Sequence, residues 1–178
     1  MEDAYSRALS LMSSLGAAEI EHPGGFLLEH LQRVEARLAN HGADDTLRLA
    51  GLTHAVYGTD GFDVRLLGVD ERDTLAQVVG GEAEALVYLY AACDRARTWP
   101  TLGRNREVHD RWTSQVIRPA GDQLVHFIDL TIVNELDVVD HAPGMKESSG
   151  TGLRGLVRSW QGLASPRVTA DGMSTLSA

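Results

Sequence analysis

Two histidines and one aspartate in the sequence are of residue types that bind metal ions. His30 and His54 each share a helical face with apolar residues, and Asp129 lies in the apolar run Phe127-Ile128-Asp129-Leu130. Neutral imidazoles and one carboxylate oxygen, with open positions for water, suit a divalent transition metal. His30, His54 and Asp129 are therefore candidate ligands of an iron, manganese or zinc ion.

Each of these three residues also has a structural interpretation. A histidine on an apolar face commonly hydrogen-bonds a backbone carbonyl in the core. A carboxylate among apolar neighbours needs a strong partner, which for Asp129 could be a backbone amide or an arginine. The spacing alone leaves both interpretations open.

Two further residues share a helical face with the candidate ligands. His126 precedes Asp129 by about one turn, and Tyr57 follows His54 by three residues. Either side chain could orient a substrate or transfer a proton. Alternatively, His126 could contact a metal ligand rather than the metal, or lie on the surface, and Tyr57 could be an aromatic residue at the edge of the core.

Polar residues in the nearby loops are weaker candidates. His22 lies in a glycine-containing loop before His30 and could complete the metal shell or meet the substrate, or could simply be exposed. Arg65 and Arg72 flank the loop after His54 and could bind a phosphate or a carboxylate. Glu84 is expected to favour the dipole of its helix from the first turn.

Helical periodicity dominates the chain, and no alternating run indicates a sheet, so we predict an all-α bundle. The expected helices cover about residues 3–15, 26–42, 44–58, 71–79, 82–95, 122–141 and 153–163. Residues 98–105 are expected to form a loop because they contain Trp99-Pro100 and Gly103.

The organisation expected from these segments is one helical domain followed by a tail. Residues 1–142 form the domain, residues 143–164 a Gly/Ser-rich linker and a short helix that docks on the body, and residues 165–178 a flexible tail.

The composition limits the class of partner. The formal net charge of −9 disfavours a nucleic-acid polymer or an anionic membrane, whereas a small phosphate ester could still bind beside local arginines or a metal. The single cysteine, Cys93, excludes an internal disulfide, and no secretory signal or membrane span is recognisable. We therefore expect a cytoplasmic protein with a small-molecule substrate; the oligomeric state is left open.

The order of the candidate ligands resembles the HD-domain superfamily of metal-dependent phosphohydrolases. His30 in Leu28-Glu29-His30-Leu31 resembles the first metal-binding histidine, His54 the histidine of the His-Asp pair, and Asp129 the late aspartate. The resemblance covers about residues 21–140. It implies a compact HD-type helical bundle with a divalent metal held by these three residues.

The sequence is most similar within the superfamily to the hydrolase domain of ppGpp synthetase/hydrolase enzymes. The similarity rests on Gly24 six residues before His30, on Gly80-Gly81-Glu82-Ala83-Glu84, and on Asn134 after the last aspartate. The chain departs from that group at Ala55, which replaces the aspartate of the His-Asp pair, and at Tyr57-Gly58-Thr59, which replaces acidic residues. It also resembles a branch of the superfamily with His-Ala in place of His-Asp, followed by Val-Tyr-Gly-Thr.

The leading functional prediction is a metal-dependent hydrolase of a small phosphorylated or nucleotide-like metabolite. The first alternative is an HD-type non-haem iron oxygenase of a small molecule, because two histidines and one carboxylate also suit oxygen chemistry. The second is a non-catalytic domain that binds a small ligand and has lost the catalytic aspartate, as Ala55 indicates.

Overall fold

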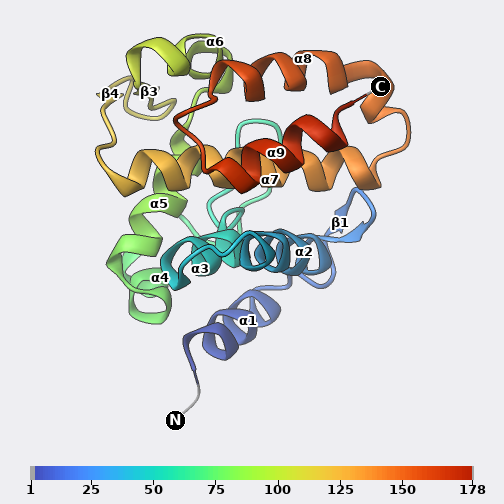
Figure 1. Cartoon of the computed structure of the whole chain (residues 1–178). Helices are drawn as coiled ribbons and strands as arrows, with labels where there is room; N and C mark the ends of the chain where they lie inside the picture. The colour runs from blue at the N-terminus through green and yellow to red at the C-terminus, as the bar shows by residue number, and fades with distance from the viewer. Residues whose placement is uncertain (1–2, 178) are drawn as a thin grey trace. The chain divides into compact units, whose positions relative to one another are not determined.

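The computed structural model describes residues 3–177 and is built mainly from helices (Figure 1). The described residues form nine helices and two hairpins whose strands are only two residues long. The expectation of an all-α chain is confirmed. The described helices include none that is long and apolar enough to cross a membrane.

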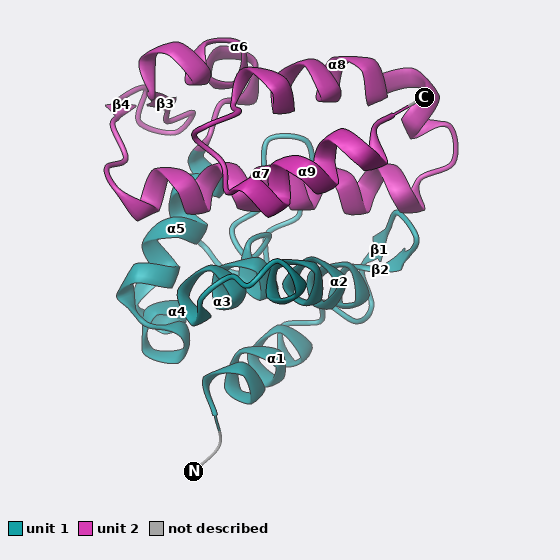
Figure 2. Cartoon of the chain, in the orientation of Figure 1, with its two compact units in different colours: residues 1–92 teal, residues 93–178 magenta. Residues whose placement is uncertain are grey.

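The chain divides into two compact units, Met1–Ala92 and Cys93–Ala178 (Figure 2). The boundary falls inside the domain of residues 1–142 that the sequence predicts, and that domain stays a prediction. Residues 1, 2 and 178, at the ends of the predicted domain and tail, lie outside the described residues.

The first unit contains five helices and one hairpin. These are α1 (Ala4–Ser14), β1 (Glu21–His22), β2 (Gly25–Phe26), α2 (Leu27–Asn40), α3 (Asp45–Thr53), α4 (Arg72–Val79) and α5 (Gly81–Ala92). The side chain of Asp3 accepts the Ser6 N–H at 2.7 Å and that of Asp44 accepts the Leu47 N–H at 2.9 Å, so an aspartate caps both α1 and α3. Helix α5 is buried on most sides and forms part of the core of this unit.

The short hairpin leads directly into α2. Glu21 pairs with Phe26 and His22 with Gly25, and the turn between the strands contains Gly24, which has a φ of 81°. The side chain of Glu29 then accepts the Phe26 N–H at 3.0 Å. The hydrogen bond satisfies a backbone donor at the start of α2 and fixes the hairpin to the helix.

Helices α2 and α3 approach closely because α3 has no side chain at the crossing point. A Cβ atom at Gly51 would lie 2.5 Å from Cδ1 of Leu38 and 3.6 Å from Cγ1 of Val34. Both leucine and valine are fully buried in α2. Gly51 therefore permits the close approach of α2 and α3.

The second unit is built around a long central helix. It contains α6 (Arg95–Asn105), β3 (Val108–His109), β4 (Val116–Ile117), α7 (Asp122–His141), α8 (Met145–Ser159) and α9 (Pro166–Thr175). Helices α8 and α9 pack on α7 and on each other, and a Cβ atom at Gly172 of α9 would lie 3.2–3.3 Å from Val157 and Ile132. Figure 2 shows α7, α8 and α9 running beside one another.

The expectation of a loop over residues 98–105 is wrong, because this segment is part of α6. Asp94 caps the helix by accepting the Arg97 N–H at 3.0 Å. Pro100 removes one helical hydrogen bond, at a cost of about 3 kcal/mol or more in a helix interior. Burial of Thr98 and Leu102, together with the His109 N–H that donates to Thr98 Oγ1 at 3.0 Å, offsets that cost.

The C-terminal segments also differ from the expectation. Helix α8 begins at Met145, inside the predicted linker, and α9 covers most of the predicted flexible tail. Pro166 at the first turn is preorganised for a helix start, and Val168 and Leu176 are buried. The tail is therefore helical because it has apolar residues to bury.

Helix α3 of the first unit is shorter than the sequence predicts. It ends at Thr53 rather than near Gly58, so His54 is its C-cap residue.

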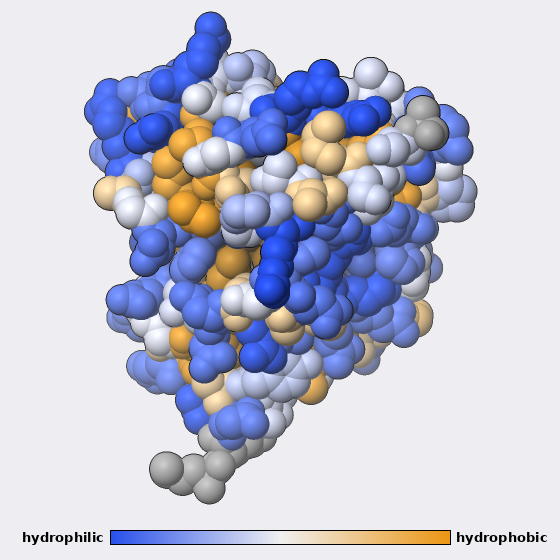
Figure 3. Space-filling model, in the orientation of Figure 1, coloured by the Kyte–Doolittle hydropathy of each residue, from blue (hydrophilic) through white to orange (hydrophobic). Residues whose placement is uncertain are grey.

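Most large apolar side chains of the described residues are buried. On the face shown in Figure 3, hydrophilic residues predominate and hydrophobic ones gather in small patches. The large apolar residues with substantial exposure are Phe26, Val64, Val69 and Val116.

Candidate metal-binding site

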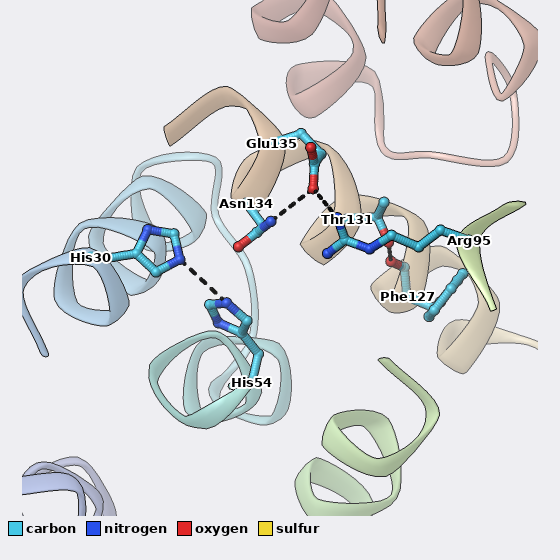
Figure 4. A network of polar contacts seen from close by, with 7 residues as sticks. All are labelled: His30, His54, Arg95, Phe127, Thr131, Asn134 and Glu135. Carbon is cyan, nitrogen blue, oxygen red and sulfur yellow. Dashed lines mark hydrogen bonds and ion pairs between the residues drawn. The ribbon is translucent and has the colours of Figure 1, made fainter. Parts of the chain in front are cut away.

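Two buried histidines of the first unit point their ring nitrogens at each other. The Nε2 atoms of His30, on α2, and His54, at the end of α3, lie 3.4 Å apart (Figure 4). Both side chains are almost fully buried, with exposures of 1% and 2%. The close packing of α2 and α3 at Gly51, one turn before His54, brings the two imidazoles together.

The protonation of His54 follows from its second ring nitrogen. Nδ1 lies 2.8 Å from the carbonyl oxygen of Gly51, which can only accept, so Nδ1 carries the proton. In the neutral ring the lone pair is then on Nε2, the atom that faces His30. A histidine that ligates a metal commonly donates its other N–H to a backbone carbonyl in this way.

The geometry of this histidine pair fits two ligands of one metal ion. Two nitrogens bound at about 2.0–2.1 Å to a tetrahedral ion stand about 3.3–3.4 Å apart. The same contact also suits a hydrogen bond from His30 to His54. Over residues 3–177, no three His, Cys, Asp or Glu side chains are grouped as they would be to hold a metal. The pair thus supplies two ligand positions, and Asp129 as a third ligand stays a prediction.

Other rings surround the histidine pair in the first unit. His22 stacks on His30 with ring centroids 4.1 Å apart and an interplanar angle of 26°, and its edge meets Phe62. The ring of Tyr90 on α5 meets that of His54 edge to face, with centroids 5.3 Å apart. The half-buried His22 therefore lies directly beside the pair, where a residue that completes the metal shell or contacts the substrate would have to lie. Phe62 and Tyr90 were not singled out in the sequence.

Tyr57 belongs to a buried network of three residues. Its hydroxyl donates to Glu84 at 3.1 Å, and Arg72 donates to both oxygens of Glu84, from Nε at 2.6 Å and from Nη2 at 2.7 Å. Burial raises the pKa of the Tyr57 phenol, and the negative charge of Glu84 raises it further. The side chain is fully buried, and its role in orienting a substrate or transferring a proton stays a prediction.

The arginines proposed to bind an anion have protein partners. Arg72 is held by Glu84, whose hydrogen bonds raise the pKa of the guanidinium, and Arg65 forms an exposed ion pair with Asp63 at 3.1 Å. Glu84 lies in the first turn of α5, where the sequence places it, and it is 4% exposed, so it also serves as the buried acceptor of this network. Its place among the apolar residues of α5 is the sequence signal that could have indicated burial.

Asp129 and His126 both lie on α7 of the second unit. Asp129 is 4% exposed, and its Oδ1 accepts the backbone N–H of Ser165 at 2.9 Å. This contact is one of the partners that the sequence left open, a backbone amide. It ties α7 to the beginning of α9. His126 is half-buried on the same helix.

A second polar network of this unit surrounds Asn134. Its Nδ2 donates to Glu135 Oε1 at 3.0 Å, and the same oxygen accepts from Arg95 Nη1 at 2.9 Å (Figure 4). The guanidinium of Arg95 also lies over the ring of Trp99, 4.8 Å from its centroid. The network links α6 to α7.

Comparison with known proteins identifies the fold. The model of a family described as a domain of unknown function (DUF6817) matches residues 11–95. None of the curated proteins matches the chain. A solved structure described as a metazoan ortholog of SpoT that hydrolyses ppGpp and plays a role in starvation responses matches with a TM-score of 0.62 and 9% sequence identity. The match covers 96% of this chain and 93% of that chain.

This likeness shows the fold alone, because the identity is low. The chain has the all-α HD-like helical bundle that the order of its candidate ligands implies.

Proposed function

We propose that the chain is a metal-dependent hydrolase of a small phosphorylated or nucleotide-like metabolite, with His30 and His54 as ligands of the metal. The observation that carries the proposal is the approach of their Nε2 atoms to 3.4 Å, with the His54 lone pair directed by the Gly51 carbonyl. The activity by which the similar structure is described, hydrolysis of ppGpp, supports the choice of a phosphorylated nucleotide as substrate.

The roles of the chain's own residues follow from their contacts. A bound divalent ion would polarise a phosphoryl oxygen and lower the pKa of a water molecule. Gly51 holds His54 in the tautomer that a ligand needs, and His22, stacked on His30, is the residue we assign to proton transfer or substrate contact. Asp129 as the carboxylate ligand and His126 as a second proton-transfer residue complete the proposal.

A non-catalytic ligand-binding domain is the second candidate function. Ala55 is buried, with an exposure of 2%, where HD hydrolases have an aspartate. A methyl group there can neither bind a metal nor activate water. This candidate predicts that ligand binding survives the loss of His54.

Metal analysis of the purified protein separates the two candidates. We expect near-stoichiometric metal in the wild type, loss of it in His30→Ala and His54→Ala, and retention in the control variant His41→Ala, since His41 caps the end of α2 away from the pair's contacts. Circular dichroism checks the fold of each variant. Release of phosphate or pyrophosphate from ppGpp then tests activity. A wild-type protein that takes up no iron, manganese or zinc overturns the hydrolase.

A further inference from the structure

Helix α5 holds the segment after α3 at two points. This segment, His54 to Tyr57, forms turns rather than helix. At its first residue the ring of Tyr90 meets the His54 imidazole, and at its last residue Glu84 accepts the Tyr57 hydroxyl. One candidate metal ligand therefore lies at the start of a short segment that is fixed at both ends by the same helix.

The acceptor at the second point is itself immobilised. Arg72 grips both oxygens of Glu84, and its guanidinium also lies 4.0 Å from the centroid of the Tyr88 ring. A buried carboxylate needs such compensation, and a bidentate guanidinium fixes its orientation as well as its charge. Tyr57 therefore donates to an oxygen whose position is defined by two other contacts.

The regular helix has ended where this turn begins. His54 is the C-cap of α3, where helix ends lose the hydrogen-bond ladder. Beyond it, the Val56 N–H donates to the Thr53 carbonyl at 3.0 Å and the Gly58 N–H to the Ala55 carbonyl at 2.9 Å, and the Val56 carbonyl accepts the N–H groups of Leu66 and Leu67 at 2.8 and 3.0 Å. These contacts hold the backbone, and the hydroxyl of Tyr57 holds its side chain. A shift of Tyr57 would be transmitted over three residues to the ring of His54.

We propose that the network of Arg72, Glu84 and Tyr57 is a positioning device for His54, which sets the direction of its Nε2 atom toward His30. The inference rests on the proposed function only where the test measures metal binding by His30 and His54. The orientation of the His54 ring is measurable without any metal.

The chain offers a matched control for the network. Glu35 on α2 is also a buried carboxylate, with an exposure of 5%, and it accepts from Arg48 Nε at 2.8 Å and lies 2.7 Å from its Nη2. Neither member of this ion pair belongs to the turn after α3. Glu35→Gln therefore perturbs a buried ion pair of the same unit without loosening Tyr57.

The test compares Tyr57→Phe, Glu84→Gln and Glu35→Gln in the full chain. The ¹⁵N resonances of the histidine rings, recorded without metal, report the tautomer and surroundings of His54. Titration with zinc alone then measures the affinity of the histidine pair. We expect Tyr57→Phe and Glu84→Gln to shift the His54 signals and weaken zinc binding about tenfold or more, as for residues that orient a ligand. Glu35→Gln, whose ion pair with Arg48 joins α2 to α3, should lower the melting temperature and change both readouts less than the two network variants do.

Two results overturn the inference. One is a folded Tyr57→Phe protein with wild-type His54 signals, and this variant, which lacks only a hydroxyl, keeps the test valid if Glu84→Gln does not fold. The other is an equal change in the His54 signals of Glu84→Gln and Glu35→Gln. If the wild type binds no zinc, the proposed function fails, and the ring signals alone decide the positioning role.

Discussion

A Cβ atom placed on Gly51 would lie 2.5 Å from Cδ1 of Leu38, so α3 can pack on α2 as it does only because residue 51 lacks a side chain. The same packing brings His30 and His54 together, and the Gly51 carbonyl also accepts the His54 Nδ1–H. The absence of a side chain at position 51 thus permits the close approach of the two histidines, and the backbone carbonyl of the same residue sets the tautomer of His54.

Replacement of Gly51 should therefore disturb the fold and the histidine pair together. Leu38 is fully buried and cannot swing into solvent, so we expect Gly51→Ala to destabilise the protein by about 1–3 kcal/mol through overpacking. Denaturant unfolding measures the loss, and the histidine ring signals measure the separation of His30 from His54.

The double variant Gly51→Ala with Leu38→Ala is the control for this mechanism. Removal of the clashing methyl groups should make the two changes less than additive. If the two changes are strictly additive, or if Gly51→Ala is as stable as the wild type, then the close approach of α2 and α3 is not the cause of a loss of stability.

The second prediction concerns stability at alkaline pH. In the unfolded chain Tyr57 ionises at the ordinary tyrosine pKa of 10.0, whereas burial and the charge of Glu84 raise its pKa in the folded chain. Below pH 10 the phenol is neutral in both states and the pH has no effect through this group. Above pH 10 only the unfolded state gains the charge, so stability should fall by about 1.4 kcal/mol per pH unit through Tyr57.

Tyr57→Phe has no phenol to ionise, so comparison with this variant isolates the pH dependence of stability that Tyr57 causes. The variant loses one hydrogen bond at every pH, so the difference in unfolding free energy between wild type and variant is compared at pH 7 and at pH 11. We expect the wild-type advantage to shrink over that interval. Arg72 remains charged throughout, because its hydrogen bonds to Glu84 raise the pKa of a guanidinium that is already strongly basic. A constant difference would show that the phenol is accessible to hydroxide.

The third prediction concerns the glycines in α8. Added Cβ atoms at Gly152 and Gly155 would meet nothing within 4 Å, and neither residue has a positive φ. Both positions are exposed and helical. Gly152→Ala and Gly155→Ala should each stabilise the protein by up to about 1 kcal/mol, because alanine favours helix over the unfolded chain. Thermal melts check this.

Gly172→Ala is the matched contrast within the same unit. Its Cβ would lie 3.2–3.3 Å from Val157 and Ile132, which are buried, so the substitution should not stabilise. Stabilisation at 172 and none at 152 and 155 would mean that α9 is not docked and that α8 is not a regular helix.

The helices with strong apolar periodicity could be predicted closely from the sequence. The residues of α1, α2 and α7 lie where that rhythm places them, since one buried stripe defines each of these helices. Helix α6 could not be predicted from Pro100 and Gly103, which are typical of loops. Its helical signal is the cap at Asp94, which lies before the segment that contains the proline. Helices α8 and α9 were underestimated because Gly, Ser and Pro are counted as breakers, although Val157 and Val168 give these helices a core to join.

The candidate site was predictable only in part. The burial of His30, His54 and Asp129 follows from helical periodicity, because each shares a stripe with apolar residues. The meeting of two Nε2 atoms and the grip of Arg72 on Glu84 depend on how separate helices pack, which no local pattern encodes. The partner of Asp129, the backbone amide of Ser165, lies in a segment that the sequence assigned to a tail.

The last prediction separates the two roles open to Asp129. Asp129→Asn keeps an oxygen that can accept the Ser165 N–H, so its stability should stay close to that of the wild type. Asp129→Ala leaves a buried donor without that acceptor and should cost about 1–3 kcal/mol. A neutral amide is a poor ligand for a transition metal, so Asp129→Asn should lose metal if the carboxylate is a ligand. Asp122→Asn, an exposed change on the same helix, controls for net charge.

Metal content and thermal stability together decide whether Asp129 binds the metal or only docks α9. Loss of metal in a fully stable Asp129→Asn protein would establish the carboxylate as a ligand beside the histidine pair. Bound iron with oxygen consumption would then favour an oxygenase, whereas manganese or zinc with phosphate release would favour the hydrolase. Full metal retention in Asp129→Asn, with destabilisation in Asp129→Ala, would instead confine Asp129 to docking α9. The metal would then rest on His30, His54 and water, because an ion held by two imidazoles must complete its coordination from solvent or substrate.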